Sequence, residues 1–177
     1  MKNFVNKRAA SLQPSGIRKF FDIVQKMEGA VSLGVGEPDF VTPWDVRDAA
    51  IRSLQRGYTQ YTGNRGLPEL RSLISRYLAE RFSVNYPPER TIVTVRATEA
   101  IDLAFRAVSD DGDQILNPEP SNLSYAPAVT LAGGTPVAVK CVAGNDFILT
   151  PDLLEKAITS KTKAVIIAYP NNPTGAV

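Results

Sequence analysis

The chain has 177 residues, 44% of them hydrophobic and 21% charged, which is ordinary for a globular domain with a sizeable core. Its net charge of +2, without a block of Lys or Arg, gives no support for nucleic-acid binding. One cysteine, Cys141, and no histidine exclude an internal disulfide, Ser-His-Asp or Cys-His catalysis, and the common histidine-based zinc sites.

The first half of the chain reads as helices separated by loops. Apolar residues at helical spacing predict helices over residues 14–29, 42–57 and 67–82. Gly57 suits the C-terminal exit of the second of these helices. A short strand is predicted at the start of 30–40, running into a loop rich in Gly and Pro. No apolar run reaches the roughly 20 residues of a membrane span, and the N-terminus lacks the apolar core of a secretory signal, so we expect a cytoplasmic protein.

From residue 91 onward, short strands alternate with helices. The strands are predicted at residues 91–95, 113–117, 135–140 and 163–168, and the helices at 98–108, 124–133 and 150–158. Such alternation is typical of crossover units around a parallel sheet, and the continuous apolar run 163–168 fits a sheet covered on both faces. We therefore predict an α/β fold with a mainly parallel sheet and helices on both faces. The apolar helix 98–108 is expected to be buried on most sides.

In such sheets ligands bind at the carboxyl ends of the strands. Thr98 follows a predicted strand and opens a helix, where backbone N–H groups and the helix dipole favour an anion. Its hydroxyl could equally cap its own helix. In YPNNPTG, two prolines and a glycine stiffen the backbone around Asn172, whose amide could bind a ligand oxygen, although a plain turn has the same composition.

These loops belong to five stretches of the chain: SLGVGEPDF, YTQYTGNRGLPELR, VTVRATEAIDLAFRAV, GDQILNPEPSNLSYAP and AYPNNPTGAV. Their order and spacing, from about Pro14 to Val177, resemble the class I/II aminotransferases, which are pyridoxal 5′-phosphate (PLP) enzymes of fold type I. The resemblance implies a large domain of the PLP-transferase type that is incomplete, because family members are considerably longer. Residues 1–42 would form an N-terminal arm and the start of the small domain, and residues 43–177 the N-terminal half of the PLP-binding large domain.

The resemblance also implies roles for individual residues. Arg96, Ala97 and Thr98 occupy the positions of the cup that binds the PLP phosphate. Asn172 would donate a hydrogen bond to the cofactor's phenolic oxygen and favour its ionised form. Gly36 would lie beside the substrate carboxylate through its backbone. No residue of the chain matches a metal ligand.

Three further positions bear on the cofactor. Tyr61 would reach across a homodimer interface to the PLP phosphate of the neighbouring subunit. Asn122 stands where the family usually has an aromatic residue stacked on the pyridine ring, and a face contact of that kind is worth on the order of 1 kcal/mol. Arg96 replaces a small residue, often Gly, and either obstructs the phosphate or pairs with it as a charged fork.

The function implied by the resemblance is transfer of an amino group from an amino acid to an α-keto acid. The Schiff-base lysine would lie beyond the part that this chain matches, so the 177 residues alone should be inactive. Lys161 precedes the last predicted strand, at the end opposite the ligand loops, and is expected to be a solvated loop lysine.

Two alternatives stay open: another PLP reaction such as decarboxylation, elimination or cyclisation, or a cofactor-impaired homologue, since Arg96 and Asn122 both alter the PLP pocket. Nucleotide binding is a distant third, because no complete G-x-G-x-x-G pattern is present.

Overall fold

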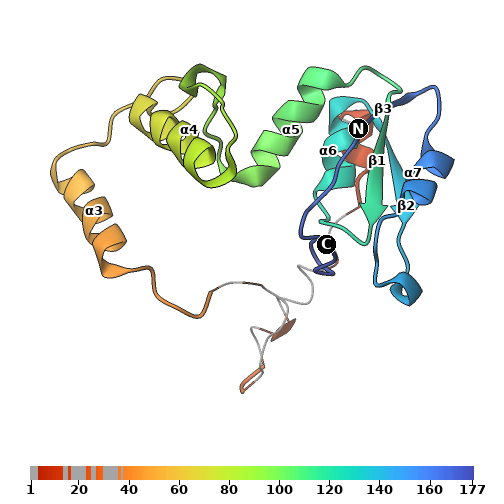
Figure 1. Cartoon of the computed structure of the whole chain (residues 1–177), viewed down its shortest axis with the longest axis horizontal. Helices are drawn as coiled ribbons and strands as arrows, with labels where there is room; N and C mark the ends of the chain where they lie inside the picture. The colour runs from red at the N-terminus through yellow and green to blue at the C-terminus, as the bar shows by residue number, and fades with distance from the viewer. Residues whose placement is uncertain (1–3, 14–15, 17–22, 25–26, 30–35, 37) are drawn as a thin grey trace. The chain divides into compact units, whose positions relative to one another are not determined.

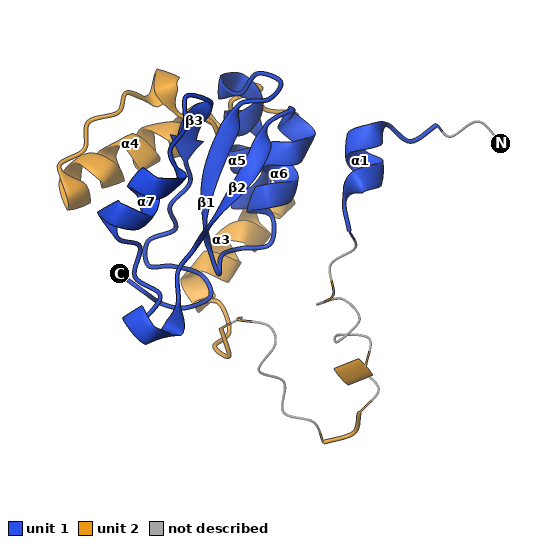
Figure 2. Ribbon diagram, turned by 90° about the vertical axis from the view of Figure 1, so that its right-hand side faces the viewer, with its two compact units in different colours: residues 1–15, 95–177 blue, residues 16–94 orange. Residues whose placement is uncertain are grey.

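The computed structural model describes residues 4–13, 16, 23–24, 27–29, 36 and 38–177. The chain divides into two compact units, one of residues 1–15 and 95–177 and the other of residues 16–94 (Figure 1, Figure 2). The helix predicted at 14–29 and the strand predicted within 30–40 lie largely outside the described residues. Among the described residues, no helix is long and apolar enough to cross a membrane.

The first unit is built on a three-stranded parallel sheet. Its strands are β1 (Gln114–Glu119), β2 (Thr135–Lys140) and β3 (Thr162–Val165), in the order β2-β1-β3. The crossover helices are α6 (Tyr125–Ala132) and α7 (Pro151–Ala157), and α5 (Arg96–Val108) precedes β1. Figure 1 shows α5 and α6 on one face of the sheet and α7 on the other. The predicted α/β architecture is therefore confirmed.

The core lies between the sheet and helices α5 and α6. Ile115, Leu116 and Val129 are fully buried, and Ile115 and Val129 cluster with Phe105 and Ala128. Within the fully described helix α5, Phe105 alone is buried, so the prediction that this helix is buried on most sides is wrong. Its apolar surface exceeds what one short sheet can cover, because the sheet meets only one side of it.

The last predicted strand is shorter than its apolar run. Strand β3 ends at Val165, although the backbone N–H of Ile166 still donates to the carbonyl of Leu116 at 3.0 Å. Beyond this bond the chain leaves the sheet and enters the loop 169–177. The strand carries that loop to the carboxyl edge of the sheet, next to the loop that follows β1.

A short helix, α1 (Lys7–Ser11), also belongs to the first unit. Asn6 caps it, since its Oδ1 accepts a hydrogen bond from the backbone N–H of Ala9 at 2.8 Å. Arg8 pairs with Asp111 at 2.5 Å, and both side chains are largely exposed to solvent. An exposed ion pair of this kind contributes at most about 1 kcal/mol.

The second unit contains α3 (Trp44–Gln55), α4 (Pro68–Phe82) and the 3-10 turn η1 (Pro88–Arg90). Neither α3 nor α4 buries a residue completely. Gly57 follows α3 with a φ of 76°, which supports its predicted place at the helix exit.

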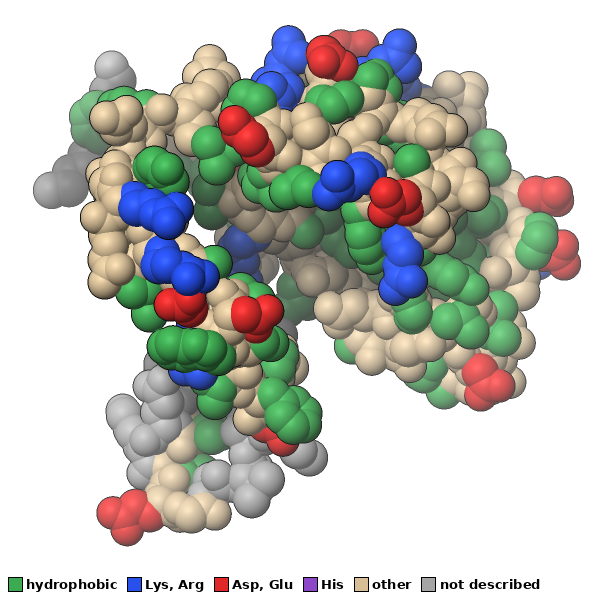
Figure 3. All heavy atoms as spheres, turned by 60° about the vertical axis from the view of Figure 1, so that its left-hand side comes forward, with side chains coloured by type: hydrophobic (Ala, Val, Ile, Leu, Met, Phe, Trp, Pro, Cys, Tyr) green, Lys and Arg blue, Asp and Glu red, His purple; other side chains and the backbone are tan. Residues whose placement is uncertain are grey.

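Figure 3 shows the side chains of the described residues coloured by type. On the face shown, basic and acidic side chains are interspersed among hydrophobic ones, so no single sign of charge dominates that face.

Helix α4 and the loop before it are held by side-chain donors to the segment that follows the helix. Arg71 Nη1 donates to the carbonyl of Pro88 at 3.0 Å, and Arg65 Nη1 donates to that of Glu89 at 2.7 Å. The backbone N–H of Val93 donates to the backbone carbonyl of Arg65 at 3.1 Å. Residues 91–95 form no strand in the described structure, so that prediction is wrong: Val93 bonds to a loop, and no neighbouring strand lies beside it.

Candidate functional site

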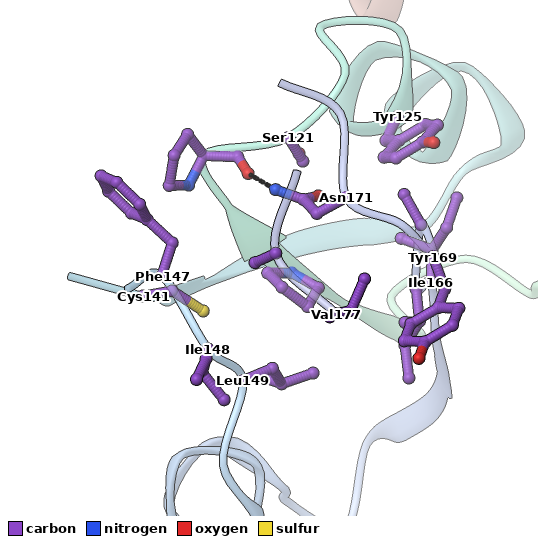
Figure 4. Close-up of a pocket in the computed structure, with 15 residues that line it drawn as sticks. Ser121, Tyr125, Cys141, Phe147, Ile148, Leu149, Ile166, Tyr169, Asn171 and Val177 are labelled. Atoms are coloured by element: carbon purple, nitrogen blue, oxygen red, sulfur yellow. Dashed lines mark hydrogen bonds between the residues drawn. The ribbon is translucent and has the colours of Figure 1, made fainter. Parts of the chain in front are cut away.

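Two loops meet at the carboxyl edge of the sheet, and a single side chain joins them. The loop after β1 contributes Pro120, and the loop after β3 contributes Asn171 and Thr174. Asn171 Nδ2 donates to the carbonyl oxygen of Pro120 at 3.0 Å (Figure 4). It also donates to Thr174 Oγ1 at 2.7 Å. The sequence pattern did not single out Asn171, because nothing in YPNNPTG distinguishes which of its two amides faces the neighbouring loop.

The loop that carries Asn172 is also closed by backbone hydrogen bonds. The N–H of Asn171 donates to the carbonyl of Ala176, and the N–H of Gly175 donates to the carbonyl of Asn171, both at 2.8 Å. The Asn172–Pro173 peptide bond is cis. Asn172 itself is exposed. The predicted ligand-binding amide therefore projects from a loop with a fixed backbone.

Asn122 is engaged at the start of α6. Its Oδ1 accepts hydrogen bonds from the backbone N–H of Ser124 at 2.9 Å and from Ser124 Oγ at 2.8 Å. The side chain is half-buried. Its carbonyl oxygen is thus used within its own turn, and the amide nitrogen is the end of the side chain that is left to face a ligand.

The N-terminus of α5 carries the three residues predicted to bind phosphate. Val95 precedes the helix and supplies no side-chain cap, while its own N–H donates to the carboxylate of Glu99. Ala97 and Thr98 are exposed. In Figure 1 this end of α5 and the carboxyl ends of the strands lie on the same, lower side of the unit. The dipole and the first N–H groups of a 13-residue helix that has no side-chain cap favour an anion at its start.

Arg96 has a φ of 73°, a left-handed conformation that suits glycine. We expect Arg96→Gly to raise the free energy of unfolding by up to about 1 kcal/mol, since it relieves a backbone penalty of about 1–2 kcal/mol at some cost in chain entropy. Urea denaturation followed by circular dichroism measures the change. Arg96→Ala is the matched control, because it removes the side chain but keeps the penalty. Equal stabilisation by both variants would show that the backbone is not the cause.

The other predicted residues lie elsewhere. The carbonyl of Lys161 accepts from the N–H of Gln114 at 2.8 Å, which places Lys161 at the amino ends of β1 and β3, opposite the two loops. Its predicted position is confirmed. Tyr61 and Gly36 are exposed and belong to the second unit.

A mainly apolar cavity of about 240 Å³ lies beside the joined loops. Ile166, Tyr169, Asn171 and Val177 line it together with Cys141 (Figure 4). Burial raises the pKa of the Cys141 thiol. A raised pKa leaves less of the reactive thiolate at neutral pH, so this cysteine is not an activated nucleophile.

Comparison with known proteins gives a consistent result over the whole chain. The sequence profile of the family "Aminotransferase class I and II" matches residues 28–177. The chain is 51% identical to "Putative aminotransferase YugH" of Bacillus subtilis (strain 168), over 100% of this chain and 46% of that protein. It is 39% identical to an aspartate aminotransferase of Pyrococcus horikoshii, over 99% of this chain and 45% of the relative.

A solved structure of the aspartate aminotransferase from Thermus thermophilus with maleate is also similar. Its TM-score is 0.90 at 34% identity, covering 97% of this chain and 46% of that one. The chain thus spans a little under half the length of the relatives that it matches. Together with the profile match over most of its residues, these similarities show that the chain belongs to the class I and II aminotransferase family.

Proposed function

We propose that this chain is the N-terminal part of a PLP-dependent aminotransferase, which transfers an amino group from an amino acid to an α-keto acid. The observation that carries the proposal is the joining of the Asn172 loop to the loop after β1, on the same side of the unit as the N-terminal end of α5. Residues 1–42 would be the arm and the start of the small domain, and residues 43–177 half of the large domain. Family membership supports this assignment.

The residues present fit the chemical groups of PLP. The phosphate needs donors and positive potential, which the N-terminus of α5 offers through Arg96, Ala97 and Thr98. The phenolic oxygen needs a donor, which the exposed amide of Asn172 can supply. Asn122 would lie near the ring and donate from its amide nitrogen, since its oxygen is already bonded. When bound, PLP supplies the electron sink that makes the amino acid's Cα–H bond breakable.

The chain's own contribution is binding and orientation. Asn172 would hold negative charge on the phenolic oxygen, and the backbone of Gly36 would lie beside the substrate carboxylate. Tyr61, which is fully exposed, would serve the phosphate of a second subunit in a homodimer. Lys161 lies at the wrong end of the sheet to supply the reacting amine, so we propose that the 177 residues bind PLP without turnover.

Binding measurements test this function. Pyridoxine 5′-phosphate carries the phosphate, ring and phenol of PLP but no aldehyde, so it cannot form imines with surface lysines. We expect the wild type to bind it in isothermal titration calorimetry. Thr98→Val and Asn172→Ala should each weaken binding about tenfold, since each removes a hydrogen bond to a charged group. Lys161→Ala is the matched control and should bind as the wild type does.

Two outcomes would contradict the proposal: no binding by the wild type, or an equal loss in Lys161→Ala. Transaminase turnover by the 177 residues with added PLP would contradict the proposed lack of activity. Similar proteins are named aspartate, aromatic-amino-acid and probable N-acetyl-LL-diaminopimelate aminotransferases, so their names do not agree on one amino donor. Product analysis of a longer chain would separate transamination from decarboxylation, elimination and cyclisation.

A second candidate is a cofactor-impaired homologue. It is favoured by the left-handed backbone at Arg96 and by the engaged oxygen of Asn122. Both features lie in the region proposed to receive PLP. Failure of the wild type to bind pyridoxine 5′-phosphate would support this candidate over the enzyme.

A further inference from the structure

We propose that Asn171 is a positioning residue that fixes the loop carrying Asn172 to the loop carrying Asn122, so that the two present a single surface to the cofactor. The proposal rests on the proposed function and adds to it a residue that touches neither the cofactor nor the substrate. Asn171 immediately precedes Asn172, and its partner Pro120 lies two residues before Asn122.

Both side-chain amide protons of Asn171 are used in hydrogen bonds. An amide nitrogen has two protons, and Nδ2 directs one to the carbonyl of Pro120 and the other to Thr174 Oγ1. The same Thr174 oxygen accepts from the N–H of Ala176 at 3.2 Å. The side chain is half-buried, so losing either bond leaves acceptors poorly hydrated. A single amide thus satisfies one acceptor in each loop.

The backbone of Asn171 is held as firmly as its side chain. Its N–H and its carbonyl both bond within the same loop, to Ala176 and Gly175 respectively. The residue is therefore fixed by four hydrogen bonds, of which only the side-chain bond to Pro120 reaches the neighbouring loop. Removing that bond should free the two loops from each other without unfolding the sheet, whose ladder lies outside them.

The test uses variants that change the donors and little else. Asn171→Asp keeps the shape of the side chain but has no proton to donate, so it loses the bond to the carbonyl of Pro120 and sets a negative charge against that oxygen, while the Thr174 hydroxyl can turn and donate to the new carboxylate. Thr174→Val removes one acceptor without adding charge, and Thr174→Ser keeps the hydroxyl as its matched control. Asn172→Ala removes the proposed cofactor contact alone.

The first measurement is hydrogen exchange without ligand. Asn171→Asp should increase exchange about tenfold in both loops, 120–124 and 169–176, as expected for loss of the hydrogen bond that joins them. Thr174→Val should increase exchange in the second loop, and Thr174→Ser should match the wild type. Unchanged exchange at 120–124 in Asn171→Asp would overturn the proposal.

The second measurement is the pH at which bound pyridoxine 5′-phosphate changes its phenol absorbance. A hydrogen bond to the ionised phenol lowers its pKa, so Asn172→Ala should move the midpoint to higher pH. Asn171→Asp and Thr174→Val should move it in the same direction, and combining the uncharged change Thr174→Val with Asn172→Ala should add nothing further. An unchanged midpoint, or additive shifts, would overturn the positioning role. If the wild type binds no probe, the proposed function fails, while hydrogen exchange still decides whether Asn171 joins the loops.

Discussion

Replacing Ile115 with alanine is expected to lower the free energy of unfolding of the first unit by about 2–5 kcal/mol. Ile115 is fully buried at the centre of the sheet and clusters with Phe105, Ala128 and Val129. Its truncation loses the transfer free energy of the removed atoms and leaves a cavity. The central strand is bonded on both sides and cannot easily collapse into that cavity.

Urea denaturation followed by far-ultraviolet circular dichroism measures this change. Ile158→Ala makes the same chemical change at an exposed site just after α7, where the side chain is 53% exposed. It should cost no more than about 1 kcal/mol. Similar losses in the two variants would mean that the buried cluster around Ile115 is not the stabilising core.

Replacing Gly66 with alanine is expected to lower the stability of the second unit by about 2–4 kcal/mol. Gly66 has a φ of 88°, which penalises any residue with a Cβ. A Cβ here would also lie 2.7 Å from Val93 Cβ and 2.9 Å from its Cγ2. These atoms sit at the base of a branched side chain, so relief of the clash requires the backbone to move.

Hydrogen exchange in α4 and in residues 88–93 is the appropriate measurement, because neither α3 nor α4 contains a buried residue that a global probe would follow. The free energy of opening that exchange reports should fall by about 2–4 kcal/mol. If the opening free energy of the wild type is smaller than this, protection should be lost completely. Gly63→Ala is the control, since nothing lies within 4 Å of its added Cβ. Equal losses in both variants would show that contact with Val93 is not the cause.

Periodicity and turn chemistry predict the crossover part of the fold well. Strands β1 and β2 and helices α6 and α7 lie where the sequence pattern puts them, because each apolar run is bounded by Gly, Pro or a change of period. The run 91–95 has the same β-branched composition, yet it forms no strand. A strand needs a partner, and the partner of Val93 is the loop carbonyl of Arg65, which no local pattern reveals.

The site shows the same division between what is local and what is not. The positions of Thr98 at a helix start and of Lys161 opposite the loops follow from chain order alone. The turn around Asn122 and the link from Asn171 to Pro120 depend on which donor faces which acceptor in the folded chain. Residues 120 and 171 are 51 positions apart, so the sequence contains both groups but does not show that they are in contact.

The central place of β1 also bears on the order of assembly. Gln114 pairs with Thr135 through the α6 crossover and with Thr162 through a connection more than twice as long. Closing the longer loop costs roughly 0.7 kcal/mol more in chain entropy. Pairing of β1 with β2 therefore has the lower entropic cost and is the expected folding nucleus. Strand β3 then pairs with a β1 that is already in place. The two loops that Asn171 joins would then meet only at this last step, so the proposed site would be completed by the latest event in folding.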